Sequence, residues 1–447
     1  MRVHILCSLL CLGRRTLTGI ITTSGGQWLD WSAHYRLYSR DRVDPEKCFD
    51  VIRQGVQDLL KPQAPLVVAI DDTIKPKRGV RIDGVGFRRD PLGPKFRVNL
   101  VLAQRFLQFS AAVPASDGSA RLIPIDFLHA PGAKKPRKKA DALALAQYKE
   151  EQKQANLNYR ANQRIARLRE VMDPGRELML VVDGSYTNGA VIKKLPQRTT
   201  LIGRIRKDAV LSEMPKPTNK PGRRPSYGPE RPTPEQIRGD DKIPWLQVRA
   251  YAAGKTHVFK VKVVKKVLWR KCGTKRQLQL IIIAPLGYRL RKNSRMLYRQ
   301  PAYLICTDSQ LDLQQLLQYY LWRWQIEVNF RDQKSLLGMG EAQVRTRASN
   351  RNLPAINVAA YSMLWLASLE ANPSQKIENL LPPAKWRADL KHRERPTTSA
   401  LLQSLRYDAW AGSLRPSSFY HFTDKDSRTA KSQKPTTNIA SALFQTN

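Results

Sequence analysis

The stretch Tyr320-Leu-Trp-Arg-Trp-Gln-Ile-Glu-Val-Asn-Phe-Arg-Asp-Gln-Lys334 decides how this chain is interpreted. It places Tyr320, Arg323, Glu327 and Lys334 at offsets of 0, 3, 7 and 14 residues within a helix predicted from about 312 to 336. An α-helix turns by about 100° per residue, so these four side chains would lie within roughly 60° of one another. Apolar residues surround this polar stripe: Leu321, Trp322, Ile326, Val328 and Phe330. Because a carboxylate and cations on a buried helix are costly unless they serve one another or a ligand, the stripe is a candidate functional site.

The chain carries a large excess of positive charge. Its 447 residues include 77 Lys and Arg against 37 Asp and Glu, which gives a formal net charge of +40. Such a surplus repels itself in a compact fold, so we expect a polyanionic partner, with DNA or RNA first and an anionic membrane surface second. A hydrophobic content of 42% predicts a folded chain, and the length allows two or three domains.

Several classes of site are excluded by what the sequence lacks. The five cysteines form no Cys-x-x-Cys pair, so they indicate free thiols in a reducing cytoplasm and neither a disulfide framework nor a zinc site. No His-Glu-x-x-His, Walker or Gly-x-Ser-x-Gly motif occurs. The apolar run at residues 3–12 is too short to span a bilayer, and no other segment is long enough. We therefore expect no membrane association.

Two apolar runs are followed by acidic residues. Residues 66–72 end in Asp71-Asp72 and residues 178–183 end in Asp183, and both runs predict buried strands with carboxylates at their carboxyl ends. A basic turn is expected at residues 73–79. Mg²⁺ prefers oxygen ligands, and paired ions can activate a nucleophile and stabilise the leaving oxygen. Two strand-end acids together with Glu327 would suit a two-metal nuclease site.

The remaining pattern alternates helices and strands. Helices are predicted near 3–12, 45–60, 137–171, 189–195 and 353–369, and strands near 98–104, 108–113, 200–206 and 302–307, the first two as a hairpin. Strands at 248–253, 257–269 and 277–284 predict a small antiparallel sheet. The proline-rich, basic residues 212–244 predict a flexible loop, and a disordered polar tail is expected from about 415.

The full pattern Tyr-x2-Arg-x3-Glu-x6-Lys resembles the signature of a large group of bacterial insertion-sequence transposases. The order strand-Asp, strand-Asp, β-rich insertion, helix-Glu also resembles DDE transposases, over roughly residues 65 to 370. The resemblance implies an α/β fold: a ribonuclease-H-like catalytic core, with a mixed sheet flanked by helices, an inserted β-rich subdomain and a helical N-terminal region. The expected division is 1–62 helical and DNA-contacting, 63–206 first part of the core, 207–310 β-rich insertion, 311–372 final part of the core, and 373–447 C-terminal helices and tail.

By this resemblance Asp71, Asp183 and Glu327 are the catalytic, metal-binding triad. They would bind two Mg²⁺ ions, with Mn²⁺ as a substitute. Asp72 is the alternative to Asp71, because relatives place the first acid either directly before a threonine or one residue earlier. Adjacent strand residues point to opposite faces, so only one of the two can enter the site, and we prefer Asp71.

The signature also implies contacts with DNA. In similar enzymes the Tyr and Lys of the motif touch phosphates, which assigns Tyr320 and Lys334 to DNA binding. Arg323 would bind a phosphate or pair with a carboxylate, and Arg331 is a further DNA-binding candidate. Trp322 and Trp324 are interpreted as core residues.

The resemblance implies a Mg²⁺-dependent DNA endonuclease and strand transferase that cleaves insertion-sequence ends and joins them to target DNA. The alternatives are a ribonuclease-H-like nuclease without strand transfer and an inactive, transposase-derived DNA-binding protein. A homodimer on paired DNA ends and a cytoplasmic, nucleoid-associated location are also expected.

Overall fold

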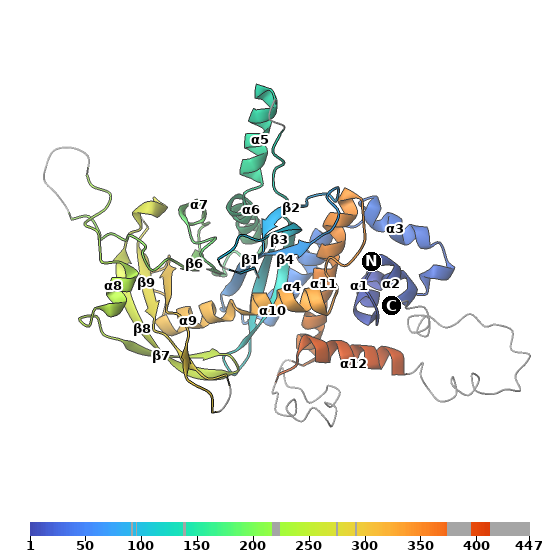
Figure 1. Ribbon diagram of the computed structural model, residues 1–447. Helices are drawn as coiled ribbons and strands as arrows, with labels where there is room; N and C mark the ends of the chain where they lie inside the picture. Colours follow the sequence, from blue (N-terminus) through green and yellow to red (C-terminus); the bar gives the residue numbers. More distant parts are fainter. Residues whose placement is uncertain are drawn as a thin grey trace, which may run out of the picture.

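The structure is a mixed α/β fold built on one large sheet. The computed structural model describes residues 1–90, 93–94, 96–136, 140–216, 224–273, 276–290, 293–372 and 395–411. Within these residues ten strands form a single mixed sheet, and helices cover both of its faces (Figure 1). The expected α/β class, with a ribonuclease-H-like mixed sheet flanked by helices, is confirmed.

Three neighbouring strands form the parallel centre of the sheet: β1 Leu66–Pro76, β5 Leu178–Val182 and β6 Thr199–Arg204. Both faces of β5 and of residues 66–70 in β1 are covered, which explains why the sequence shows these two segments as continuous apolar runs. The pairing of β1 with β5 ends at Ile70↔Val182, but β1 continues to pair with β3 as far as Pro76. Asp71 and Asp72 therefore lie within a strand, and the turn predicted to begin at residue 73 is wrong.

The two strands predicted at 98–104 and 108–113 are one strand. β3 (Leu100–Pro114) pairs with β1, with the short β2 (Gly86–Arg89), and in a true hairpin with β4 (Ala120–His129), which the sequence analysis missed. The polar residues that interrupted the apolar pattern are buried in β3 and hydrogen-bonded. The amide of Gln104 donates to the carbonyl of Asp83, and the amide of Gln108 donates to the hydroxyl of Ser110.

The β-rich insertion extends the same sheet. Its strands are β7 Leu246–Ala252, β8 Lys255–Val267 and β9 Leu278–Ile283, followed by β12 Ala302–Cys306. They pair antiparallel, as predicted, but β12 joins them to β6, so the sheet order is β2-β3-β1-β5-β6-β12-β9-β8-β7 with β4 on β3. The insertion is therefore continuous with the core sheet. The pair β10 (Gly287–Tyr288) and β11 (Leu297–Tyr298) forms a small separate sheet.

The predicted basic loop at 212–244 contains ordered structure. The helix α8 (Pro234–Gly239) starts with a capping box, in which the hydroxyl of Thr233 accepts from the backbone N–H of Gln236 and the Gln236 side chain accepts from the backbone N–H of Thr233. Ile237 of this helix is buried against the sheet. The flexible-loop prediction is wrong for this part, and residues 217–223 lie outside the described residues.

Helices at the N-terminus pack around one long helix from the end of the core. The N-terminal helices, α1 Arg2–Leu10, α2 Leu17–Thr23, α3 Trp31–Ser39 and α4 Pro45–Leu59, lie beside α11 Arg347–Ala371 (Figure 1). α12 (Thr398–Ala411) contacts α1 and α11. Residues 373–394 and 412–447, which hold most of the expected C-terminal segment and its tail, are not among the described residues. No helix in the described ranges is both long and apolar enough to cross a membrane.

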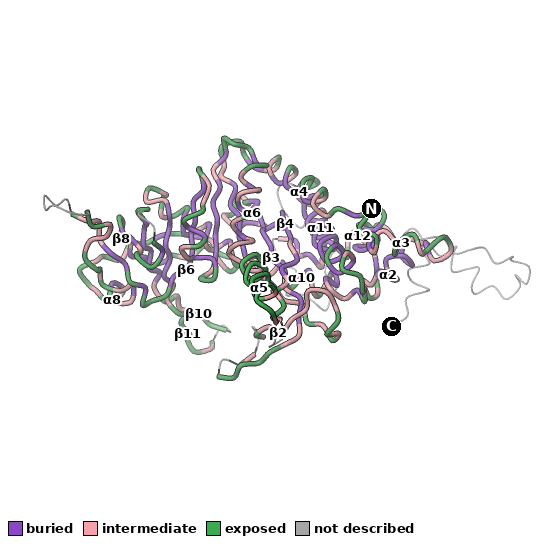
Figure 2. Tube along the Cα trace, turned by 90° about the horizontal axis from the view of Figure 1, so that it is seen from above, coloured by how far each residue is buried: buried purple, intermediate pink, exposed green. Residues whose placement is uncertain are grey.

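The long helix predicted at 137–171 is two helices. α5 (Ala142–Gln154) ends near Ala155, and the side chain of Asn156 caps the start of α6 (Leu157–Val171). None of the residues of α5 is buried (Figure 2), and this helix projects from the body of the molecule (Figure 1). Only α6 packs on the sheet, through Ile165 and Leu168.

The signature helix is also divided. α9 (Leu313–Trp322) and α10 (Gln325–Ser335) are separated by a tightened turn at Arg323 and Trp324. The backbone N–H groups of Arg323 and Trp324 bond three residues back, to the carbonyls of Tyr320 and Leu321 at 3.2 and 3.4 Å. The prediction of one continuous helix, and of a single straight stripe on it, is therefore wrong, because a 3₁₀-type turn changes the rotation per residue.

The two faces of the sheet have different covers. Val68 and Ile70 of β1 belong to a cluster with α4, α6 and α11, whereas Val67 and Ala69 belong to a cluster with α9 and α10. Val181 of β5 lies in the second cluster. This alternation assigns each side chain that follows along β1 and β5 to one of the two faces.

We predict that Asn329→Ala destabilises the protein by about 2–4 kcal/mol. Asn329 is buried at the point where α10 meets the sheet and α11. Its amide donates to the Ser110 hydroxyl and the Leu122 carbonyl at 3.3 and 3.1 Å, and its oxygen accepts from the Tyr361 hydroxyl at 3.0 Å. The truncation would leave these buried groups without partners. Urea unfolding monitored by circular dichroism measures the loss, and an unchanged midpoint would contradict this role.

Candidate active site

Two carboxylates lie next to each other at the end of the β1–β5 ladder. Ile70 pairs with Val182, so Asp71 and Asp183 are the next residues on two adjacent parallel strands. By the alternation of the strands, both follow the positions that face α9 and α10. The first two predicted acids are therefore brought together on one face of the sheet.

Arg323 links the strand carboxylate to the helix carboxylate. One guanidinium nitrogen of Arg323 lies 3.7 Å from Asp71, and another lies 3.8 Å from Glu327. The Arg323 side chain is only 15% exposed, so the turn between α9 and α10 buries a cation among the acids. The structure thus places Asp71, Arg323 and Glu327 in one row above the sheet.

The electrostatics show that the acids crowd one another. Burial, and then the charge of Asp183, raise the pKa of Asp71 from 3.8 to about 7, against the opposing effects of a backbone hydrogen bond from Asp72 and the charge of Arg323. Burial is also the main cause that raises the pKa of Glu327; Arg323 opposes it and Asp183 adds to it. The charge of Asp183 therefore acts on both Asp71 and Glu327, as expected for carboxylates gathered at a functional site.

Asp72 belongs to the opposite face of β1. The hydroxyl of Tyr186 donates to Asp72 at 3.1 Å. Burial raises the pKa of Asp72, whereas Arg105 and the Tyr186 hydrogen bond lower it. Its partners thus differ from those of Asp71, which sits on the side of α10. This geometry favours Asp71 as the first acid of the site.

The remaining signature residues lie around this row. The ammonium of Lys334 donates to the hydroxyl of Thr73 at 2.6 Å, and burial lowers the pKa of Lys334, with the nearby Lys75 adding to the effect. Tyr320 is half-buried, and its ring centre is 5.8 Å from the Arg323 guanidinium carbon. Lys334 thus faces β1, two residues beyond Asp71.

Arg331 and the two tryptophans depart from the row. Arg331 is 69% exposed and pairs with Asp332 at 2.8 Å, and Asp332 is buried and accepts from the Thr398 hydroxyl. Trp322 is buried, and its indole N–H donates to the carbonyl of Gly118 at 2.9 Å. Trp324 is 59% exposed, so its interpretation as a core residue is wrong. It lies in the turn between α9 and α10.

The residues fit a divalent ion by chemistry. Asp71, Asp183 and Glu327 supply the carboxylate oxygens that Mg²⁺ prefers as ligands, and the charge of Asp183 raises the pKa of both Asp71 and Glu327. Among the described residues, however, no three acidic, histidine or cysteine side chains lie close enough together to enclose an ion. Arg323 supplies the positive charge between Asp71 and Glu327 instead, and its Nε has no hydrogen-bond partner in the described structure.

The sequence analysis missed several partners of these residues. Tyr186 lies three residues after Asp183 and reaches Asp72, and the hydroxyl of Thr187 donates to the carbonyl of Asp183 at 2.6 Å. Thr73 binds Lys334. A weak signal was present, because both short segments that follow the strand acids carry hydroxyl side chains.

Comparison with known proteins identifies the family. No curated protein matches the chain in sequence. The profile of the DDE superfamily endonuclease family matches residues 2–276, which include Asp71 and Asp183 and end before Glu327. Members of this superfamily are nucleases that use divalent metal ions and act on DNA. The match covers more than half of the sequence, and the chain belongs to the DDE superfamily endonuclease family.

Proposed function

We propose that the protein is an insertion-sequence DNA transposase of the Tyr-Arg-Glu-Lys group. The observation that carries this proposal is that Arg323 lies between Asp71 and Glu327, while Asp183 stands beside Asp71 on the next strand. Transfer at phosphorus requires clustered carboxylates for metal ions and cations for the phosphate, and this row provides both. The family supports nuclease chemistry, and the complete helix signature supports the finer assignment.

Asp71, Asp183 and Glu327 are the residues that would hold two Mg²⁺ ions, with Mn²⁺ as a substitute. When bound, such ions lower the pKa of the attacking water or hydroxyl and neutralise charge on the leaving oxygen. Arg323 would then exchange its carboxylate partners for a phosphate oxygen, which a planar guanidinium binds well. Tyr320, Lys334 and the exposed Arg331 would bind neighbouring phosphates and orient the strand.

The proposed reaction has two displacements at phosphorus. Water attacks the phosphorus at the element end, its bond to the 3′ oxygen breaks, and that oxygen takes up a proton. The freed 3′-hydroxyl then attacks phosphorus in the complementary or target strand, and another 3′ oxygen leaves. Each step breaks one P–O bond and forms one, so no oxidant or nucleotide is consumed.

The wider setting follows from the same proposal. Two element ends must be held together for joining, so we propose a homodimer on paired ends, with the helical N-terminal residues 1–62 contacting DNA. The net charge of +40 suits a cytoplasmic, nucleoid-associated protein that is bound to DNA for most of the time.

Product analysis tests the proposal. Labelled DNA that carries the element end is incubated with the protein, unlabelled target DNA and Mg²⁺ or Mn²⁺, and a chelator provides the control. We expect labelled end joined to target. Nicked or hydrolysed ends without joined product would instead support a nuclease without strand transfer. DNA binding without cleavage under any divalent ion would support an inactive derivative.

A further inference from the structure

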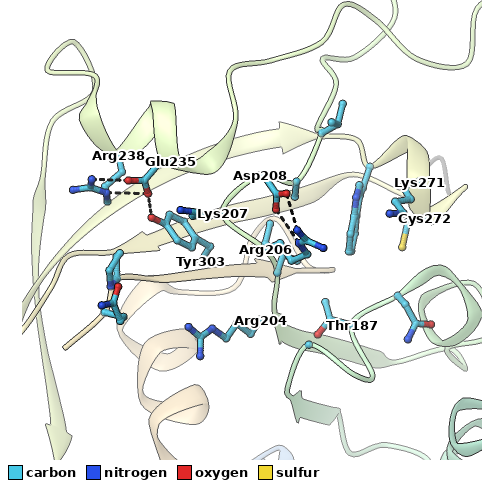
Figure 3. A pocket seen from close by; sticks show the side chains of 18 of the residues that line it. Thr187, Arg204, Arg206, Lys207, Asp208, Glu235, Arg238, Lys271, Cys272 and Tyr303 are labelled. Carbon is cyan, nitrogen blue, oxygen red and sulfur yellow. Dashed lines mark hydrogen bonds and ion pairs between the residues drawn. The ribbon is translucent and has the colours of Figure 1, made fainter. Parts of the chain in front are cut away.

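A basic cleft opens beside the carboxylates, at the same edge of the sheet. It has a volume of about 1020 Å³ and lies between the ends of β5, β6 and β12 and the segments around α7 (Gly189–Ile192), α8 and the turn that precedes Cys272. Its wall begins at Gly184, the residue after Asp183. Figure 3 shows its charged side chains, Arg204, Arg206, Lys207, Asp208, Glu235, Arg238 and Lys271.

Three of the cations in this cleft form no ion pair with a described residue. Both carboxylates are engaged, since Asp208 pairs with Arg206 at 2.9 Å and Glu235 pairs with Arg238 at 2.7 Å (Figure 3). Arg204, Lys207 and Lys271 have no ion pair with any described residue, and all three are exposed. The cleft therefore carries an excess of positive charge, which an anionic ligand would stabilise.

The sheet register places one residue of the cleft wall, Arg204, in line with the carboxylates. Val182 pairs with Gly203, so Arg204 stands beside Asp183, just as Asp183 stands beside Asp71. Arg204 thus continues the row across three adjacent parallel strands. A phosphodiester chain whose reacting phosphate lies at Asp71 and Asp183 would meet Arg204 next.

The walls of the cleft are fixed by the backbone. The N–H of Glu235 donates to the carbonyl of Lys207 at 3.0 Å, which holds α8 against the segment that follows β6. A Cβ atom on Gly189 would lie 2.4 Å from the carbonyl oxygen of Cys272, so α7 and the opposite turn are in direct contact. The backbone segments that carry the charged side chains are therefore held in place before a ligand binds. This lowers the conformational entropy that is lost on binding.

The lining also suits unpaired bases. Besides the cations it contains the half-buried Trp269 and the apolar Ile205, Pro285 and Pro301. Grooves that bind single strands combine backbone-tracking cations with aromatic faces on which bases stack. The volume lies at the upper end of the range for small-ligand cavities, so it accommodates a few nucleotides but not a double helix.

We propose that the basic cleft binds a single-stranded segment of DNA next to the phosphate that is positioned at Asp71 and Asp183. This inference rests on the proposed function and deepens it: the substrate would be unpaired beside the cleavage point. Lys207 and Lys271 contact its phosphates from opposite walls, Arg204 lies between the cleft and the carboxylates, and Trp269 offers a stacking surface.

The test compares binding of single-stranded and duplex DNA by the full chain in chelator, so that no cleavage occurs. The variant is Lys207→Glu with Lys271→Glu, and the control is Lys149→Glu with Lys255→Glu, two exposed lysines outside the cleft with the same change in net charge. Fluorescence anisotropy measures the Kd of a labelled thymidine oligonucleotide and of a blunt duplex over a series of salt concentrations. Thermal unfolding checks that each variant is folded.

We expect the cleft variant to bind the single strand at least about tenfold more weakly, with a salt dependence shallower by about 1.4 in the logarithmic slope, as for two lost phosphate contacts. Its duplex affinity should match that of the control. Equal losses on single strand and duplex, or no loss on either, would overturn the proposal. Failure of the wild-type protein to cleave any DNA would count against the proposed function alone, because strand binding is measured without cleavage.

Discussion

Replacement of Glu327 by glutamine is expected to lower metal-dependent DNA cleavage at least about 10³-fold, equivalent to about 4 kcal/mol of activation free energy. The amide has nearly the shape of the carboxylate but lacks its charge, so it is a poor ligand for a hard divalent ion. DNA binding should persist, because the substitution removes a negative charge near phosphates. Cleavage of labelled DNA in single-turnover assays, together with anisotropy in chelator, separates the two effects.

Glu177→Gln is the matched control for this substitution. Glu177 is 43% exposed and pairs with Arg198 at 2.9 Å, while Glu327 is 40% exposed and pairs with Arg323. Glu177 directly precedes β5, however, and so lies at the other end of the sheet from Asp183. We expect this variant to cleave at the wild-type rate. A Glu327→Gln protein that remained as active as Glu177→Gln would remove Glu327 from the site.

Asp71→Asn should make the metal-free protein more stable at pH 8, by about 1–3 kcal/mol. Burial and the charge of Asp183 raise the pKa of Asp71 from 3.8 to about 7, so the folded chain holds a carboxylate where it is disfavoured. Each pH unit between the two pKa values contributes at most about 1.4 kcal/mol, and structural relaxation lowers the total. The charge of Asp71 beside Asp183 therefore lowers the free energy of unfolding of the metal-free protein.

The direction of the pKa shift determines how the stability difference between wild type and Asp71→Asn varies with pH. The pKa of Asp71 is higher in the folded state than in the unfolded state, so its charge does not disfavour folding below pH 4, where both states are protonated. The penalty grows as the pH rises from about 4 to about 7 and is constant above that range. The stabilities of wild type and Asp71→Asn should therefore converge in acid and separate toward pH 8.

Urea unfolding at several pH values in chelator measures this difference. Asp208→Asn is a control of opposite sign, because the hydrogen bond from Arg206 holds the pKa of Asp208 below its ordinary value. It should give no stabilisation at pH 8. A constant difference between wild type and Asp71→Asn at all pH values would show that packing, not charge, separates them.

The central strands could be predicted from the sequence because each is marked by the residues of its own segment. Residues 66–70 of β1 and the whole of β5 are buried on both faces, so each appears as an uninterrupted apolar run followed by an acidic residue. The end of β1 was misplaced because its continuation is set by pairing with β3, a partner that a local pattern does not show. Long-range pairing likewise fixed β3 as one strand, since Gln108 is satisfied by Gln333 of α10.

The candidate acids were identified from the ends of two apolar runs and from the resemblance of the helix signature, but their arrangement was not. A straight helix would have aligned Tyr320 with Glu327, whereas the tightened turn at Arg323 and Trp324 redirects the chain between them. That turn is what sets Arg323 between Asp71 and Glu327. The cleft also escaped sequence reasoning, because Lys207 and Lys271 come from segments far apart in the chain and meet only through the sheet.

The junction of β6 with β12 has a consequence for how the protein is made. β6 leaves the ribosome at residue 204, and its neighbour β12 begins only at residue 302, so the growing chain carries an open, apolar strand edge during that interval. Such edges pair readily with other chains. Glu327 emerges later still, on α10. The nascent protein therefore cannot bring Glu327 to Asp71 and Arg323 until after β12 has been made.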